Sequence, residues 1–208
     1  MRKLDLTTWN RKTHFEFFSQ FDEPFYGVTI TVDCTIAYEK AKEKGVSFFL
    51  YYLYKTLSAV NAIENFRYRI VDNEVVVYDK INVSATIMRE DTTFGFSFME
   101  YFEDLNHFSQ KSLEEIERIQ NTPGLITRDF DGLYNLIHFS SIPWLDFTSL
   151  SHARHFKFPD SCPKISFGKM TEENGKKTMP MSIHVHHGLV DGYHVGQFAE
   201  TFQNLMNS

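Results

Sequence analysis

Four of the nine histidines lie in one short stretch near the C-terminal end of the chain, Ile183–Val195, which reads IHVHHGLVDGYHV. The same stretch contains one aspartate, Asp191. Imidazole is the side chain that ordinarily titrates between pH 5 and 8, so histidines can bind a metal ion or transfer protons near neutral pH. The chemistry of the segment therefore depends on which of its histidines share a face of the element that carries them.

The spacing of these residues leaves three interpretations. If the segment begins as a strand, its side chains alternate, so His184 and His186 share one face and His187 ends the apolar face. In the first interpretation His184 and His186 hold a metal ion, with His194 as a third ligand. In the second they are surface residues, and His187 is a hydrogen-bonded core residue. In the third His187 is a general base, and Asp191 shapes the loop that follows it.

Composition limits the classes of protein to which the chain can belong. It has 208 residues, of which 42% are hydrophobic and 16% aromatic, which suits a single domain over residues 1–208. The net charge of -6 argues against binding to nucleic acid or to a membrane surface. No apolar run reaches the roughly 18 residues of a membrane-spanning helix, and the N-terminal residues lack a secretion signal. Two cysteines are too few for a disulfide framework, so we expect a cytoplasmic protein.

Apolar periodicity predicts an α/β or α+β two-layer sandwich, in which helices pack on a mixed β-sheet. Helices are expected over residues 47–61, 104–121 and 193–206. Strands are expected over residues 27–36, 73–88, 93–102, 133–144, 164–170 and 178–187. The Asn-Gly pair within residues 171–177 predicts a hairpin reversal between the last two strands.

The string HHGLVDG resembles the active-site motif of type A chloramphenicol acetyltransferases, which belong to the coenzyme A-dependent acyltransferases. Other segments resemble that family in the same order along the chain: WNRKTHFEFF, AVNAIENFRYRI, FSSIPWLDFTSL and CPKISFGKM. This collinearity is more specific than any single motif. It favours the third interpretation of the histidines.

The resemblance implies acetyl transfer from acetyl-coenzyme A, as co-substrate, to a hydroxyl of chloramphenicol, without an acyl-enzyme. His187 is implied to remove the hydroxyl proton, and its reference pKa of about 6.5 suits that role. Ser140 is implied to donate a hydrogen bond to the oxyanion of the tetrahedral intermediate. Ser166 is implied to hold a water there. Ser141 is interpreted as structural, although the sequence alone does not separate it from Ser140.

The resemblance also implies that Asp191 pairs with Arg11 and so fixes the geometry of the site. The acceptor pocket is implied to be lined by Phe18, Pro24, Tyr26, Thr86, Phe94, His138 and Leu150. Coenzyme contacts are implied at Trp144, Lys169 and Met170, with no metal. The family is implied to form homotrimers, with each active site at an interface between subunits.

Two further interpretations of the function are compatible with the same fold. In one, the same chemistry acts on a different hydroxyl acceptor. In the other, the protein binds a small molecule without catalysis, which the presence of His187, Ser140, Asp191 and Arg11 argues against.

Overall fold

The computed structural model describes residues 1–155 and 160–208, and its main element is a mixed β-sheet. The strands lie in the order β2–β10–β8–β7–β5–β6, and β9 pairs with β10 outside that order. The contacts of β7 with β5 and with β8 are parallel, and the other pairings are antiparallel. The strands are β2 (Phe25–Asp33), β5 (Asn82–Met88), β6 (Phe94–Phe96), β7 (Leu136–Ser141), β8 (Lys164–Phe167), β9 (Thr171–Glu173) and β10 (Lys176–His186).

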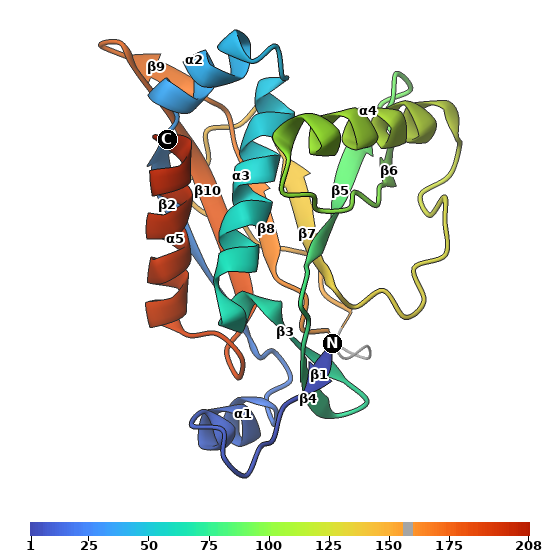
Figure 1. The fold of residues 1–208 in the computed structure, drawn as a ribbon, viewed down its shortest axis with the longest axis vertical. Coiled ribbons are helices and arrows are strands. Elements are labelled where there is room, and N and C mark those ends of the chain that lie inside the picture. Colours follow the sequence, from blue (N-terminus) through green and yellow to red (C-terminus); the bar gives the residue numbers. More distant parts are fainter. Residues whose placement is uncertain (156–159) are drawn as a thin grey trace.

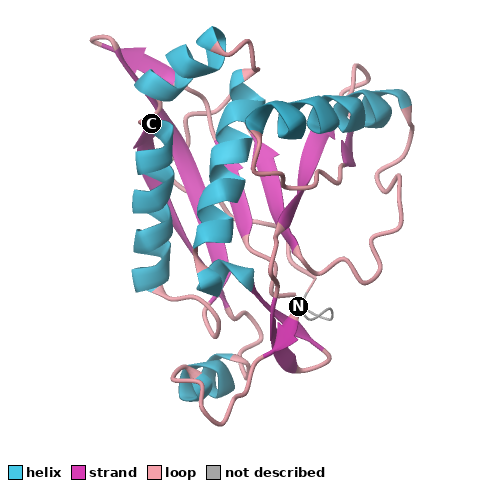
Figure 2. Cartoon of the chain, in the orientation of Figure 1, coloured by secondary structure: helices cyan, strands magenta, loops and turns pink. Residues whose placement is uncertain are grey.

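Helices cover one face of this sheet, as Figures 1 and 2 show for α3, α4 and α5. The helices are α1 (Lys12–Phe18), α2 (Thr35–Glu43), α3 (Phe48–Ala62), α4 (Leu105–Asn121), α5 (Gly192–Met206) and the 3-10 turn η1 (Glu64–Arg67). A small antiparallel sheet is built from β1 (Arg2–Lys3), β4 (Glu74–Val77) and β3 (Tyr68–Val71). The expected fold class, a mixed sheet with helices packed on it, is confirmed.

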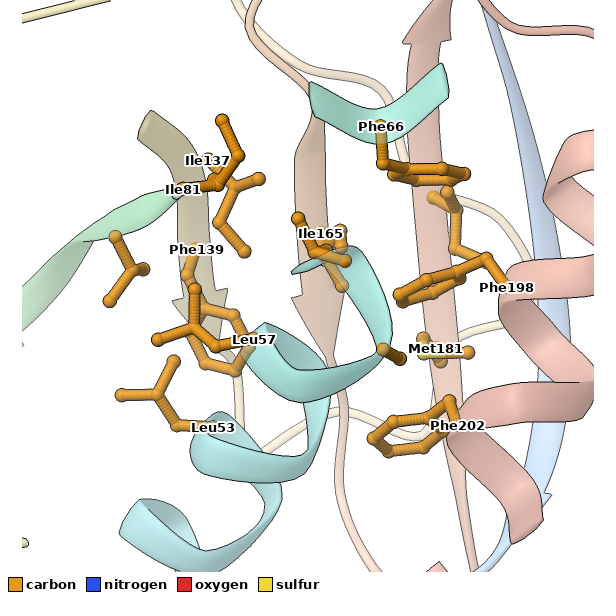
Figure 3. Close-up of a cluster of buried hydrophobic side chains, with 14 of the residues drawn as sticks. Leu53, Leu57, Phe66, Ile81, Ile137, Phe139, Ile165, Met181, Phe198 and Phe202 are labelled. Carbon is orange, nitrogen blue, oxygen red and sulfur yellow. The ribbon is translucent and has the colours of Figure 1, made fainter. Parts of the chain in front are cut away.

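The hydrophobic core lies between the helices and the main sheet (Figure 3). The fully buried side chains from the helices include Leu53, Leu57, Phe198 and Phe202. Those from the strands include Ile137, Phe139, Ile165, Phe167, Met181 and Ile183. Burying one such side chain stabilises the fold by about 1.5–3 kcal/mol, so this layer fixes the position of the strands.

The other face of the same strands is polar, because side chains alternate along a strand. Ser140 on β7 lies opposite Ser166 on β8, and Ser166 lies opposite Ser182 on β10. His138 on β7 lies opposite Lys164 on β8, and each is two residues before the serine on its strand, so all four share one face. Polar residues therefore occupy the face that the helices do not cover.

Most of the expected helices and strands are present, and local hydrogen bonds and turns fix where several of them begin or end. Ser47 caps α3 by accepting a hydrogen bond from the Leu50 N–H at 3.2 Å, and Asp104 caps α4 in the same way. Asn174 and Gly175 both have positive φ, as a hairpin turn between β9 and β10 requires.

Three expectations were wrong in detail. The strand expected over residues 27–36 ends at Asp33, and the helix α2 that follows was not predicted, because its buried face is only Ala37 and Ala41. The stretch expected as one strand over residues 73–88 contains two strands, β4 and β5, which belong to different sheets. The strand β6 is shorter than expected.

Among the described residues, no helix is both long enough and apolar enough to cross a membrane.

Candidate active site

His187 is the first residue after β10 and is held by packing on its ring. Its backbone N–H donates to the Pro24 carbonyl at 2.8 Å. Its ring stacks on Phe18 with centroids 3.9 Å apart and 6° between the planes, and the Tyr26 ring lies 4.5 Å away. Because β10 ends at His186, strand alternation does not set the direction of the His187 side chain, which differs from expectation. Two aromatic rings from α1 and β2 set it instead.

Arg11 and Asp191 form an ion pair beside this imidazole. Arg11 is 7% exposed, and its Nη1 donates to the Asp191 carboxylate. Its Nη2 donates to the His187 carbonyl at 3.2 Å, so Arg11 links the two residues. Burial alone would raise the pKa of Asp191, but the hydrogen bond and charge of Arg11 outweigh it and hold that pKa below its ordinary value. Asp191 therefore stays ionised at neutral pH.

The same carboxylate also begins the last helix. Asp191 is the N-cap of α5 and accepts a hydrogen bond from the Tyr193 N–H at 3.1 Å. His194 completes a capping box, because its Nδ1 accepts a hydrogen bond from the Asp191 backbone N–H at 3.2 Å. We refer to Phe18, Tyr26 and His187 with the Arg11–Asp191 pair as the imidazole cluster.

Ser140 and Ser166 form a second group, the serine pair, on the uncovered face of the sheet. Their Oγ atoms are 2.7 Å apart, and strand register places the two residues side by side on β7 and β8. Ser140 is partly exposed, whereas Ser166 is fully buried. The next residue, Ser141, instead accepts a hydrogen bond from the Tyr52 hydroxyl of α3 at 3.0 Å. Neighbouring serines thus face opposite sides of the sheet.

The imidazole cluster and the serine pair do not meet within one chain. Ser166 lies opposite Ser182 on β10, and His187 comes five residues after Ser182, just beyond the end of that strand. At about 3.4 Å per residue, this separates them by roughly 17 Å. The span is too long for one small substrate to bridge a base and an oxyanion donor in the same chain.

Comparison with known proteins identifies the family to which the chain belongs. The sequence profile described as chloramphenicol acetyltransferase matches residues 1–203. The chain belongs to the chloramphenicol acetyltransferase family. This confirms the resemblance drawn from HHGLVDG, and membership makes the protein an acyltransferase.

Individual members of the chloramphenicol acetyltransferase family are similar over nearly the whole chain. The enzyme of Proteus mirabilis is 32% identical over 96% of this chain and 92% of its own. Chloramphenicol acetyltransferase 3 of Escherichia coli is 28% identical over 99% of this chain and 97% of its own. A solved structure of a chloramphenicol acetyltransferase is 34% identical, covers 99% of both chains and has a TM-score of 0.92.

The remaining positions implied by the chloramphenicol acetyltransferase resemblance fall in several places. Phe18, Pro24 and Tyr26 surround His187, and burial raises the pKa of Tyr26 to about 12, so its phenol stays neutral. Thr86 and Phe94 lie on the β5–β6 hairpin. Leu150 lies in the loop after β7 and is partly exposed.

The three coenzyme candidates lie just beyond the ends of the parallel strands β7 and β8. Trp144 is 64% exposed, and Lys169 is exposed as well. The Lys169 N–H donates to the carbonyl of Leu145, beside Trp144, at 2.7 Å. Met170 is partly buried against the core. The structure thus brings the loops that carry these residues together.

The other histidines of the segment have structural partners. His186 is 4% exposed, its Nδ1 accepts from the Gly188 N–H at 3.1 Å, and burial lowers its pKa to about 4. His184 is partly buried and packs on Gly27, where a Cβ would lie 2.3 Å from its Nε2 and would displace the ring. The interpretation of His184 and His186 as surface residues is therefore wrong. Across residues 1–155 and 160–208, no three His, Cys, Asp or Glu side chains are arranged to hold a metal ion.

Sequence reasoning missed a charged group beside the serine pair. Lys164 is 6% exposed and pairs with Asp160, and it lies in a strand whose four residues are all buried. Its Nζ also lies 4.5 Å from the centroid of the Phe25 ring. A lysine in a buried strand was the available signal, since buried charges are rare unless paired.

Proposed function

We propose that the protein transfers an acetyl group directly from acetyl-coenzyme A to a hydroxyl of chloramphenicol. The observation that carries this proposal is the match to the family over residues 1–203. Relatives named as chloramphenicol acetyltransferases cover nearly the whole chain, which supports the same acceptor. The imidazole of His187, whose orientation is fixed by Phe18 and Tyr26, supports a reaction that begins with proton removal.

In this mechanism His187 acts as the general base. Its Nδ1 is buried without a hydrogen-bond partner among the described protein atoms, which leaves Nε2 as the nitrogen that reaches a substrate. Nε2 takes the proton of the acceptor hydroxyl while the oxygen attacks the thioester carbonyl. The tetrahedral intermediate then collapses and the C–S bond breaks; the sulfur of the coenzyme takes the proton back from the His187 imidazolium and leaves as a thiol. The Phe18 ring stacked on His187 and the Tyr26 ring tilted against it support a fixed approach for this transfer.

The serine pair supplies the hydrogen bond to the oxyanion. Ser140 is the accessible member, and its hydroxyl donates to the negatively charged oxygen of the intermediate. The fully buried Ser166 lies 2.7 Å away and orients that hydroxyl, or a water beside it. Ser141 takes no part, because its hydroxyl is engaged by Tyr52.

We infer that each complete site forms between two copies of the chain, in a homotrimer. The separation of roughly 17 Å between the imidazole cluster and the serine pair supports this, since a second copy can bring His187 to the serines of its neighbour. Such a contact joins two different surfaces, and repeating it head-to-tail closes a ring. Arg11 and Asp191 then fix the end of β10 that each subunit presents.

The substrate sites follow from this arrangement. Chloramphenicol binds against Phe18, Pro24, Tyr26, Thr86, Phe94, His138 and Leu150, and acetyl-coenzyme A against Trp144, Lys169 and Met170. The exposed ring of Trp144 beside Lys169 supports a contact with a large charged coenzyme. Two free thiols, Cys34 and Cys162, support a cytoplasmic location.

A second candidate keeps the chemistry and changes the acceptor. His138 and Lys164 lie two residues before Ser140 and Ser166 on their strands, and Asp160 pairs with Lys164. These polar side chains favour an acceptor that is more polar than one suited to an apolar pocket.

The test is to mix purified protein with acetyl-coenzyme A and chloramphenicol and to follow the release of free thiol. Release that depends on chloramphenicol, with acetylated chloramphenicol detected by mass spectrometry, is the expected result. Release with other hydroxyl compounds and none with saturating chloramphenicol would overturn the acceptor and leave the acyltransferase chemistry intact. No release with any acceptor would overturn the enzymatic proposal.

A further inference from the structure

The loop between β7 and β8 carries Leu150, and its middle part is held by side chains rather than by main-chain pairing. The start of the loop is fixed to β8, because the Ile142 N–H donates to the Phe167 carbonyl at 2.8 Å. From residue 146 to residue 155, no hydrogen bond joins the main chain to the main chain of another described residue. The position of Leu150 therefore depends on the side chains near it in this loop.

Exposure to solvent alternates along the same stretch. Leu150, His152 and Arg154 are partly buried, whereas the residues between them are exposed. A period of two is that of extended chain, in which every second side chain points to the same side. Leu150 therefore shares one side of the loop with His152 and Arg154, the side that meets the strands.

His152 packs on the main sheet through its ring. The ring lies edge-on against the His184 ring of β10, with centroids 4.8 Å apart and 90° between the planes. His184 is fixed in turn, because its ring covers Gly27 of β2 and its Nδ1 lies 3.3 Å from the Ser182 Oγ. His152 Nε2 is buried and has no hydrogen-bond partner among the described protein atoms. The contact between the two rings therefore holds His152 in place.

Arg154 ties the loop to the sheet at a second point. Its guanidinium carbon lies 3.5 Å from the centroid of the Phe25 ring, at the first residue of β2. Its Nη1 lies 3.5 Å from Glu23 Oε1, and the Phe25 N–H donates to that same oxygen at 3.0 Å. The Arg154 side chain is 13% exposed, and a cation over an aromatic ring is held more strongly when water is partly excluded. The loop is thus attached to both β10 and β2.

The contact between His152 and His184 favours uncharged imidazoles. Burial lowers the pKa of His152 to about 4, and the charges of His184 and Lys164 act in the same direction. Burial and the charge of Lys164 also lower the pKa of His184, against the opposing effect of a hydrogen bond to the main chain of Leu150. The groups that surround His152 are His184 on β10, Lys164 on β8, His138 on β7 and Arg154, while the carboxylates Asp160 and Glu23 are engaged by Lys164 and Arg154.

The direction of this pKa shift sets how the loop responds to pH. The held loop keeps the pKa of His152 below its ordinary value of 6.5, and a released loop returns it to that value. The hold is therefore complete above pH 6.5 and weakens as pH falls toward 4, because the released loop binds a proton that the held loop excludes.

We propose that His152 and Arg154 are positioning residues that hold Leu150 in place for the acceptor, and that acid releases this hold. The inference rests on the proposed function, which places Leu150 at the acceptor. Neither side chain belongs to the imidazole cluster or to the serine pair. Binding of the acceptor, and not the chemical step, therefore depends on them.

The hold itself is tested by limited proteolysis. Trypsin cuts after Arg154 only when the loop is released, so the initial rate of this cut, measured by mass spectrometry relative to other cuts in the same sample, reports the open population. His152→Ala should speed it about tenfold, because local opening becomes more frequent. His152→Phe should restore the slow rate, since a phenyl ring packs on His184 and carries no charge.

Ser151→Ala is the matched control for this experiment. Ser151 is the exposed residue before His152, so its variant should be cut at the wild-type rate. An unchanged rate in His152→Ala, or no slowing in His152→Phe relative to His152→Ala, would overturn the hold.

The consequence for the acceptor is tested by steady-state kinetics. His152→Ala should raise KM for the acceptor by about five- to tenfold, because the competent loop is less populated, and should leave kcat and KM for acetyl-coenzyme A within about twofold. His152→Phe should restore KM. Between pH 7.5 and 5.5, the acceptor KM of the wild type should rise relative to that of His152→Phe by up to about tenfold.

A fall in kcat with unchanged KM, or equal pH dependence in the wild type and His152→Phe, would overturn the positioning role. Proteolysis needs no acceptor, so it decides the hold even if no acetyl transfer occurs and the proposed function fails.

Discussion

The imidazole cluster and the serine pair are built in different ways. His187 is oriented by residues from α1, β2 and the start of α5, and Arg11 and Asp191 are 180 positions apart in the sequence. Ser140 and Ser166 are placed by the register of two adjacent strands and need no other support. A base must point in one direction to accept a proton, whereas a hydroxyl donor can rotate. The imidazole cluster therefore fixes a side-chain direction, as a general base requires, whereas the serine pair fixes only the positions of two hydroxyl groups.

The largest expected effect comes from removing the base. His187→Ala should lower kcat by about 10²–10⁴-fold and leave the fold intact, because general base catalysis contributes that much. His186→Ala is the control: this neighbouring imidazole is buried and packed, so its loss should affect thermal stability more than turnover. Steady-state kinetics and thermal unfolding of both variants check this. The opposite pattern would assign the base to His186.

A somewhat smaller loss should follow from the serine pair. Ser140→Ala should reduce kcat by about 10²–10³-fold, the usual effect of losing one oxyanion donor. Ser141→Ala should leave kcat nearly unchanged and destabilise the fold by about 0.5–1.5 kcal/mol, because it removes the hydrogen bond from Tyr52. Equal kinetic losses in the two variants would contradict the separate roles of these serines.

The ion pair should have the smallest single effects on turnover. Arg11→Ala and Asp191→Ala should each lower activity and stability, and the double variant should lose less than the sum, because removing one partner strands the other charge. The exposed pair Lys111–Glu114 is the control, and Glu114→Gln should change stability by less than about 0.5 kcal/mol. Strictly additive losses at Arg11 and Asp191 would show that the contact carries no energy.

The same pair predicts how stability depends on pH. The folded pKa of Asp191 lies below its ordinary value, so its contribution to the free energy of unfolding is present above about pH 4. That contribution is lost as pH falls through the folded pKa. Asp191→Asn should therefore flatten this part of the acid-unfolding curve, measured by fluorescence. An unchanged curve would mean that other carboxylates dominate it.

Local pattern predicted the strands of the serine pair and the helix that follows His187, but not α1, which carries Phe18. Apolar periodicity indicated α3 and α4, and alternation with the Asn-Gly turn indicated the β9–β10 hairpin. The direction of the His187 ring could not be predicted, because it depends on residues of α1 and β2 that are distant in sequence. Arg11 was paired with Asp191 only through the resemblance to a family.

The neighbours of the serine pair show the same limit. Lys164, with its partner Asp160, lies beside His138 only because β7 and β8 adopt one particular register. Local pattern gives the strands and leaves that register undetermined, so the pairing of His138 with Lys164 could not be foreseen. The sequence alone did not separate Ser140 from Ser141, and the structure does so through the hydrogen bond from Tyr52 to Ser141.

The central claim is that the base and the oxyanion donor of one site come from different chains. Its most direct test is to co-express His187→Ala and Ser140→Ala chains with different tags and to purify the assemblies that carry both. In a three-membered ring, every mixed assembly contains one interface with an intact His187 and an intact Ser140, so about a third of the wild-type rate should return. Mixed assemblies no more active than the two parent variants would show that one chain supplies both groups, and would contradict the account.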